Sequence, residues 1–302
     1  MGNILKLGIV PNTNKENVVE VVELLLSKLK GKNFKSTFSS HFYELVKSNP
    51  LFQNCEFLST KDLFTNNDLI VSIGGDGTLL TTSYDAKDYD TPMLGINFGK
   101  LGFLAEYEIN NLDRLILELE NGDYVIEERM TLCGESVIEG EASLFATNDI
   151  VIDKGHWPKM VEIGLKIDSK YVATFSADGI IIATPTGSTG YSLSVGGPIV
   201  NPIAKAITIS PISPHTLTMR PLVISDNQKV SITVKSGHEK IHVSCDGQRV
   251  TNYKSPKEFI IYSSKTPIKL LRTKSTNYYE ILRNKLYWGI DIRKNYKKED
   301  DE

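Results

Sequence analysis

Three glycines surround an aspartate in the stretch Gly74-Gly75-Asp76-Gly77-Thr78, which directly follows the apolar run of residues 69–73. Glycines permit tight turns and close approach of a ligand, and loop N–H groups beside a helix N-terminus bind anions. We expect Gly74, Gly75, Gly77 and Thr78 to bind phosphate. A carboxylate repels phosphate, so Asp76 is expected to hold a metal or accept the proton of a substrate hydroxyl, as phosphoryl transfer requires. The alternatives are a plain strand-to-helix turn and an Asp76 that only caps the helix.

A second glycine-containing loop, Asn97-Phe98-Gly99-Lys100-Leu101-Gly102-Phe103-Leu104, follows the apolar run of residues 93–97. Two neighbouring strands that both end in such loops indicate a ligand crevice at the carboxyl edge of an open sheet. Phe103 is a candidate to cover a nucleobase, and a place in the core is the alternative.

A dense set of hydroxyl groups lies between Thr184 and Ser194, after the apolar run of residues 179–183. Hydroxyl and backbone groups suit nucleoside hydroxyls and base edges, and Tyr191 offers a ring for stacking; an ordinary surface loop is the alternative. Asn148-Asp149, at the start of another apolar run, could bind a ribose diol or an adenine edge, or could form only a turn. The segment Cys245-Asp246-Gly247-Gln248 is interpreted mainly as the tip of a β-hairpin.

These residues are carried by two different patterns of elements. The first 120 residues alternate strand and helix signals, for example an apolar run at 4–10 followed by apolar residues at helical spacing between Val18 and Leu29. This βαβ rhythm predicts an α/β, Rossmann-like domain at residues 1–122, with helices expected at 41–47, 78–84 and 112–119. From there to 272, strand signals at 127–138, 149–153, 161–167, 230–234, 241–245 and 259–262 predict a mainly β domain, a β-sandwich. Residues 273–302 are predicted to form a C-terminal helix that returns to the first domain, and a charged tail.

The composition excludes several classes of protein. Of the 302 residues, 34 are basic and 37 acidic, which gives a net charge of -3 and argues against nucleic acid as a partner. No apolar run is long enough to span a membrane, and no signal peptide is visible. The three cysteines are far apart, so we expect no disulfide framework or structural zinc, and a cytoplasmic, reducing location.

Taken together, the motifs resemble those of bacterial NAD kinases. The resemblance rests on the two glycine-containing loops, on Asn148-Asp149, and on the segment from Asp178 to Ser194; Ser213-Pro-His-Thr-Leu217 and Leu282-Arg-x-Lys-Leu286 fit the same family. The Gly-Gly-Asp-Gly-Thr loop alone also occurs in lipid kinases and phosphofructokinases, whereas the 178–194 segment is much more specific.

The resemblance implies ATP-dependent phosphorylation of the 2′-hydroxyl of the adenosine ribose of NAD to give NADP. It also implies a divalent metal, usually Mg²⁺, and a homodimer or homotetramer. Asp76 is then the catalytic proton acceptor, and the two glycine clusters are expected to face one cleft. The residues implied to bind NAD are Asp76, Gly77, Phe103, Asn148, Asp149, Lys159, Asp178, Thr189, Gly190, Tyr191, Ser192, Leu193, Ser194 and Gln248.

One residue departs from the family pattern, because Gly190 stands where the family commonly has Ala. Two alternative functions stay open from the sequence. A diacylglycerol or sphingoid-type lipid kinase would need a membrane-docking face, and none is visible. A non-catalytic dinucleotide sensor would have little use for Asp76, since binding alone favours a neutral residue beside phosphate.

Overall fold

The computed structural model describes residues 4–99, 102–136 and 143–289. Clustering of contacts divides the chain into two compact units. Unit 1 comprises residues 1–79, 93–125 and 271–302, and unit 2 comprises residues 80–92 and 126–270. The charged tail and positions 100, 101, 137 and 138 of the predicted motifs and elements lie outside the described residues.

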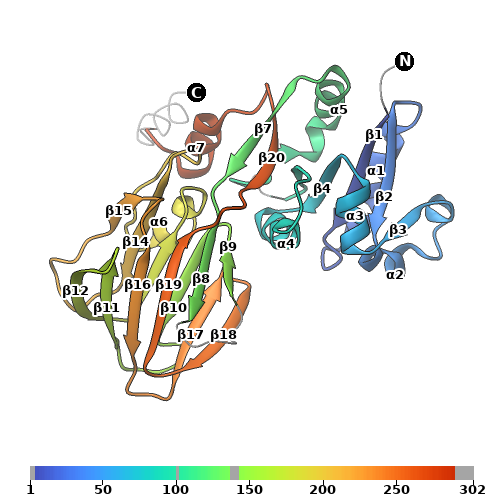
Figure 1. Ribbon diagram of the computed structural model, residues 1–302. Coiled ribbons are helices and arrows are strands. Elements are labelled where there is room, and N and C mark those ends of the chain that lie inside the picture. The colour runs from blue at the N-terminus through green and yellow to red at the C-terminus, as the bar shows by residue number, and fades with distance from the viewer. Residues whose placement is uncertain (1–3, 100–101, 137–142, 290–302) are drawn as a thin grey trace, which may run out of the picture. The chain divides into compact units, whose positions relative to one another are not determined.

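The main sheet of unit 1 has the strand order β3-β2-β1-β4-β5-β20-β7, and β6 pairs with β5. Figure 1 labels β1 to β4, β7 and β20. The pairs among β1 to β6 that can be assigned are parallel. The order reverses between β1 and β4, and in open sheets of this kind ligands bind outside the carboxyl ends of the strands at that point. The strands are β1 (Leu5–Pro11), β2 (Phe34–Ser39), β3 (Glu56–Leu58), β4 (Leu69–Gly74), β5 (Met93–Asn97), β6 (Tyr107–Glu108), β7 (Tyr124–Arg129) and β20 (Ile268–Thr273).

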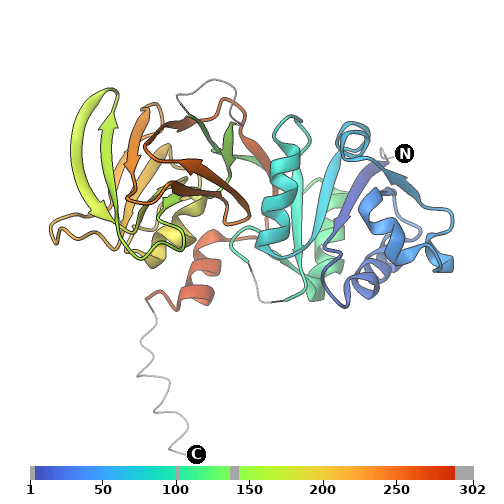
Figure 2. The same ribbon diagram turned by 90° about the horizontal axis from the view of Figure 1, so that it is seen from below.

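Helices cover both faces of this sheet (Figures 1 and 2). The buried residues of α1 and α5 pack with Leu7, Ile9 and other residues on one face, as the helical spacing of apolar residues predicts. On the other face, Gly8 leaves space for Leu63 of α3 and Gly95 for Leu79 of α4. The helices are α1 (Val18–Leu29), α2 (Tyr43–Val46), α3 (Thr60–Asn66), α4 (Asp76–Ala86), α5 (Leu112–Asn121) and α7 (Tyr278–Leu286), with short 3₁₀ turns at Ser40–Phe42, Pro50–Phe52 and Ile109–Asn111.

Two six-stranded antiparallel sheets form unit 2. One has the order β15-β14-β13-β10-β17-β18 and the other β12-β11-β16-β19-β8-β9. Their strands are β8 (Leu132–Ser136), β9 (Leu144–Ala146), β10 (Asp149–Asp153), β11 (Val161–Ile167), β12 (Lys170–Ala177), β13 (Gly179–Ala183), β14 (Ala206–Ile212), β15 (Leu222–Ser225), β16 (Val230–Lys235), β17 (Lys240–Cys245), β18 (Arg249–Lys254) and β19 (Lys257–Ser263).

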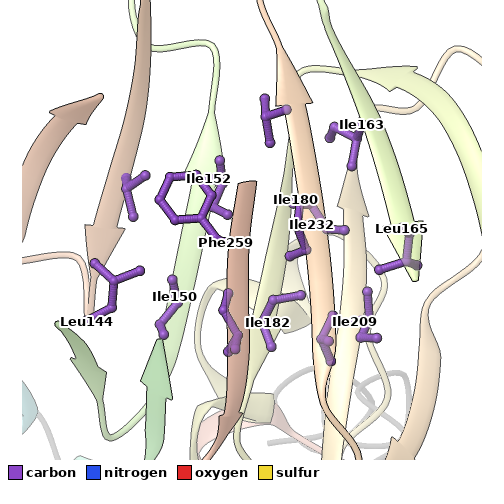
Figure 3. Packing of buried hydrophobic residues seen from close by; sticks show 14 of the residues in the cluster. Leu144, Ile150, Ile152, Ile163, Leu165, Ile180, Ile182, Ile209, Ile232 and Phe259 are labelled. Carbon is purple, nitrogen blue, oxygen red and sulfur yellow. The ribbon is translucent and has the colours of Figure 1, made fainter. Parts of the chain in front are cut away.

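A shared apolar core joins these two sheets and confirms the predicted β-sandwich. Figure 3 shows isoleucines of β10 and β13 together with Ile163, Ile232 and Phe259 of the second sheet, all of which belong to this core. This packing follows from the alternation of buried residues with half-buried or exposed ones along β11, β16 and β19.

The strand predicted at 127–138 is wrong as a single element. The structure ends β7 at Arg129 and begins β8 at Leu132, and the two strands belong to different sheets. The apolar pattern does not mark this break, because both segments have strand-like alternation. None of the helices in the described part of the chain has the apolar stretch of 18 residues that a membrane crossing requires.

Candidate functional site

The loop after β4 is built on hydrogen bonds to the hydroxyl of Thr78. This hydroxyl accepts from the side-chain amide of Asn12 at 2.9 Å and from the Gly75 N–H at 3.4 Å. A side chain at Gly74 would overlap Thr78, which explains the glycine there. Because Asn12 directly follows β1, these bonds join the carboxyl ends of β1 and β4 at the reversal of strand order. Gly75 and Gly77 remain at least partly accessible to solvent.

Asp76 is the first residue of α4, and three consecutive backbone N–H groups hold its carboxylate. Phe103 donates to Oδ2 at 2.8 Å, and Leu104 and Ala105 donate to Oδ1 at 3.1 and 2.9 Å. A Cβ at Gly102 would overlap Asp76 Oδ1, so this close approach requires glycine at position 102. A carboxylate has about four acceptor directions. Within the described residues, these three bonds leave one acceptor direction, on Oδ2, unoccupied.

The Phe103 side chain, which the sequence left open between core and ligand contact, is partly exposed. Its ring centroid lies 4.8 Å from Nζ of Lys285 on α7, within cation–π range. The ring is therefore partly accessible, while the backbone of the same residue fixes Asp76.

In unit 2, the turn before β10 is organised by Asp246. The Asp246 side chain is fully buried. Its carboxylate accepts hydrogen bonds from the backbone N–H groups of Thr147, Asn148 and Asp149 at 3.2, 2.6 and 3.3 Å. Arg249 donates to the same carboxylate at 2.7 Å. Asp246 and Gly247 both have positive φ, which confirms the predicted hairpin tip and adds a structural role to it.

Asp149 itself is buried beside this carboxylate. Burial first, and the negative charge of Asp246 second, raise the pKa of Asp149 to about 7. A substantial fraction of the Asp149 side chains is therefore protonated near neutral pH and can donate a hydrogen bond, which an ionised carboxylate cannot do.

The hydroxyl-rich segment packs against the same turn. It forms a 3₁₀ turn, η4 (Thr186–Thr189), and one turn of helix, α6 (Tyr191–Ser194). Thr184 Oγ1 donates to the Thr147 carbonyl at 2.7 Å, and the Thr184 N–H donates to the Asn148 carbonyl at 2.8 Å. A Cβ at Gly187 would overlap the Asn148 carbonyl oxygen, so glycine permits this contact.

Two buried polar atoms of this region lack a hydrogen-bond partner within the described residues. They are Asn148 Oδ1 and Thr186 Oγ1. Buried polar atoms in native proteins are nearly always paired, so such orphans point to a ligand or a water. Gly190 is close by: a Cβ there would lie 3.7 Å from Asp149 Oδ2 and 3.8 Å from Asn148 Nδ2.

The other predicted NAD-binding residues occupy varied positions. Tyr191 and Ser194 are exposed, Leu193 is half-buried, and the hydroxyl of buried Ser192 is 2.9 Å from that of Ser210. Gln248 accepts a hydrogen bond from Thr81 at 2.8 Å, and Lys159 is exposed after β10.

Asp178 is separated from the Asn148–Asp149 turn by the length of a strand. It precedes β13, which runs antiparallel to β10, and the pairing of Asp149 with Ala183 and of Asp153 with Gly179 places Asp178 at the far end. Four residue steps correspond to roughly 13 Å. Asp178 forms an ion pair with Lys154 at 2.7 Å. One extended ligand would be needed to contact both ends of β10.

Sequence reasoning did not single out four residues that organise these sites: Gly102, Glu106, Asp246 and Arg272. Gly102 and Asp246 lie within recognised motifs but have no distinctive spacing toward the residues they serve. The sequence signal at Arg272 is a charged residue that directly follows Leu270 and Leu271.

A family model described as the ATP-NAD kinase N-terminal domain matches residues 7–124, and one described as the ATP-NAD kinase C-terminal domain matches residues 147–273. The NAD kinase of Prosthecochloris aestuarii is 39% identical over 287 residues, which cover 94% of this chain and 98% of that protein. The NAD kinase of Chloroherpeton thalassium is 34% identical over 286 residues, with the same coverage of both chains.

Solved structures show the same fold. Yeast NADH kinase, complexed with NADH, superposes with a TM-score of 0.86 at 23% identity, covering 96% of this chain and 89% of that one. An NAD kinase from Archaeoglobus fulgidus in complex with ATP gives a TM-score of 0.72 at 24% identity, covering 94% and 99%. At these identities the likeness concerns the fold.

Proposed function

This chain belongs to the ATP-NAD kinase family, and on that premise we propose that it transfers the terminal phosphoryl group of ATP to the 2′-hydroxyl of the adenosine ribose of NAD, which yields NADP. The observation that supports this mechanism is the Asp76 carboxylate, which three N–H groups hold and which, among the described residues, keeps one acceptor direction on Oδ2. The lipid-kinase alternative is not favoured, since both family models and the curated relatives are NAD kinases.

In the proposed reaction, Asp76 Oδ2 accepts the proton of the attacking hydroxyl and aims its oxygen at the phosphorus. A base placed in this way contributes roughly 10²–10⁴-fold to the rate. The N–H groups around Gly74, Gly75, Gly77 and Thr78 contact the phosphates of the donor, where the N-terminus of α4 adds a favourable dipole.

NAD binding is assigned to the turn before β10 and to the η4–α6 segment. The orphaned Asn148 Oδ1 accepts from the dinucleotide, and Thr186 Oγ1 can donate or accept. Protonated Asp149 donates to a ribose oxygen or to a ring nitrogen of adenine. The remaining predicted contacts are Phe103, Lys159, Asp178, Thr189, Gly190, Tyr191, Ser192, Leu193, Ser194 and Gln248.

The proposed divalent metal, Mg²⁺, has no protein cage in the described residues: no group of three or more His, Cys, Asp or Glu side chains there is arranged to hold an ion. The described residues therefore do not fit a metal ion that stays bound to the protein without substrate. An ion that arrives on the phosphates of ATP needs few protein ligands, as is common for Mg²⁺. We therefore assign no residue to the metal.

A homodimer or homotetramer is part of the proposal. β12 and β15 are edge strands of their sheets, and apolar side chains are exposed on or near them, including Tyr171, Leu217 and Val223. Exposed apolar edges of this kind favour association with another chain. Sedimentation equilibrium would give the mass of the assembly, and a monomer at micromolar concentration would contradict this part. A cytoplasmic location is also proposed, and it is supported by three cysteines that are all free thiols.

A coupled assay tests the proposed function. The protein is incubated with ATP, Mg²⁺ and NAD, and any NADP is detected with an NADP-specific dehydrogenase. We expect NADP to accumulate in proportion to enzyme. Folded protein that binds NAD but forms no NADP above the blank would indicate the non-catalytic dinucleotide sensor instead.

A further inference from the structure

A buried ion pair lies close to Asp76 in unit 1. Arg272, at the end of β20, contacts the Glu106 carboxylate, and their side chains are 9% and 3% exposed. A buried pair gives little net stability, because the cost of removing two charges from water offsets their attraction. Its presence beside the proposed base therefore calls for another explanation.

Glu106 directly follows the turn that holds Asp76. Ala105, its neighbour in the chain, donates its N–H to Asp76 Oδ1 at 2.9 Å, and the turn closes through a 3.3 Å hydrogen bond from the Gly102 N–H to the Ala105 carbonyl. An anchor at Glu106 therefore fixes the end of the turn that carries two of the three donors. Arg272 supplies this anchor from β20, a strand inside the main sheet.

The negative charge of Asp76 also acts on the Arg272 guanidinium. Burial lowers the pKa of Arg272 to about 10, and the negative charge of Asp76 opposes that fall. The guanidinium therefore stays charged at neutral pH. It is the positive member of a group of three charges whose negative members are Asp76 and Glu106.

We propose that Arg272 is a positioning residue for the reaction: through its ion pair with Glu106 it holds the Gly102–Ala105 turn, which in turn orients Asp76. This inference rests on the proposed function and on the role of Asp76 in it. The competing explanation is that Arg272 only clamps β20 within the sheet. The two differ in what a folded variant without the ion pair would do to turnover.

The test uses the full-length protein and four variants: Arg272→Lys, Arg272→Met, the double variant Glu106→Gln/Arg272→Met, and the control Arg114→Met. Arg272→Met alone leaves Glu106 buried without its partner and is prone to unfold. The double variant removes both charges and avoids that problem. Arg114 is an exposed arginine of α5 in an i,i+4 pair with Glu118, so it controls for loss of an arginine in the same unit.

We expect the double variant, with a urea unfolding midpoint close to that of wild type, to lose roughly 10- to 100-fold in kcat, the cost of a small misplacement of a reacting group. Its KM for NAD should change less than about threefold, because the groups proposed to bind NAD around Asn148 are untouched. Arg272→Lys keeps the charge and should recover most of kcat, and Arg114→Met should match wild type.

Two outcomes overturn the inference in distinguishable ways. A folded double variant with kcat within about twofold of an active wild type means that the ion pair is only a structural clamp. A wild-type protein that forms no NADP overturns the proposed function, and this inference with it. A proportional change in kcat and KM, or a Lys variant no better than the double variant, would also contradict positioning through the ion pair.

Discussion

As the proposed general base, Asp76 has to meet two demands that usually conflict in a single side chain. A general base needs an accessible lone pair, whereas a precisely aimed side chain needs several fixed contacts. Here the three N–H donors from Phe103, Leu104 and Ala105 supply the contacts, and the last acceptor direction of Oδ2 supplies the lone pair. The carboxylate is therefore held in place before any substrate arrives.

Asp76→Asn is expected to lower kcat by roughly 10²–10⁴-fold and to leave the Kd for NAD nearly unchanged. The amide cannot accept a proton, and its NH₂ group would face one of the three N–H donors. Steady-state kinetics and calorimetry measure the two quantities. Asp113→Asn is a matched control, because Asp113 also lies in the first turn of a helix but is 80% exposed. Near-normal turnover in Asp76→Asn would remove Asp76 as the base.

The raised pKa of Asp149 predicts that the free energy of unfolding depends on pH. Its pKa is raised from 3.8 to about 7 on folding, so the folded state binds this proton more tightly than the unfolded state. The stabilisation is fully present below about pH 4 and is lost as the pH rises through about 7. The charged neighbours of Asp149, Asp246 and Arg249, are unchanged in an Asp149 variant. They therefore affect the variant and the wild type alike.

Asp149→Asn, which imitates the protonated form, should therefore gain stability relative to wild type as the pH rises. We expect the difference between the two urea midpoints to grow in favour of the variant from pH 5 to pH 8. Other titrating groups cancel in this difference. A difference that does not change with pH would show that Asp149 has an ordinary pKa.

At the scale of elements, the η4 turn and the turn before β10 support each other at Gly187. Gly187→Ala places a Cβ onto the Asn148 carbonyl oxygen, where backbone cannot move cheaply. We expect a loss of about 1–3 kcal/mol in the free energy of unfolding and a clearly weaker affinity for NAD, measured by denaturation and calorimetry.

The control for this change is Gly164→Ala on β11. The nearest atom to an added Cβ there lies 3.7 Å away, an ordinary contact. Stability and affinity close to wild type are expected for the control. Wild-type NAD affinity in Gly187→Ala would mean that the Asn148 turn does not form part of the dinucleotide site.

The elements were largely predictable from sequence, because periodicity reflects local geometry. The spacing from Val18 to Leu29 predicted α1, and the alternation at 230–234 and 241–245 predicted strands of the sandwich. Long-range partners were not predictable. Asp246 lies about a hundred residues from the turn that it organises, and Arg272 is far from Glu106, so no local pattern connects them.

At the scale of the whole molecule, the net charge of -3 is unfavourable for two anionic substrates. Attraction must come from local groups such as loop N–H donors and the N-terminus of α4 rather than from a long-range positive field. We expect the Kd for NAD to rise by less than about fivefold between 50 and 200 mM NaCl, as short-range contacts are weakly screened. A collapse of affinity over this range, measured by calorimetry, would contradict local recognition.

The proposed reaction phosphorylates one particular hydroxyl of NAD. Phosphorus NMR of the product formed from ATP and NAD, with 2′-deoxy-NAD as the paired substrate, measures this directly. We expect one new phosphomonoester on the 2′ carbon of the adenosine ribose and no product from the 2′-deoxy substrate. A phosphate on another hydroxyl, or ATP hydrolysis without transfer to NAD, would contradict it.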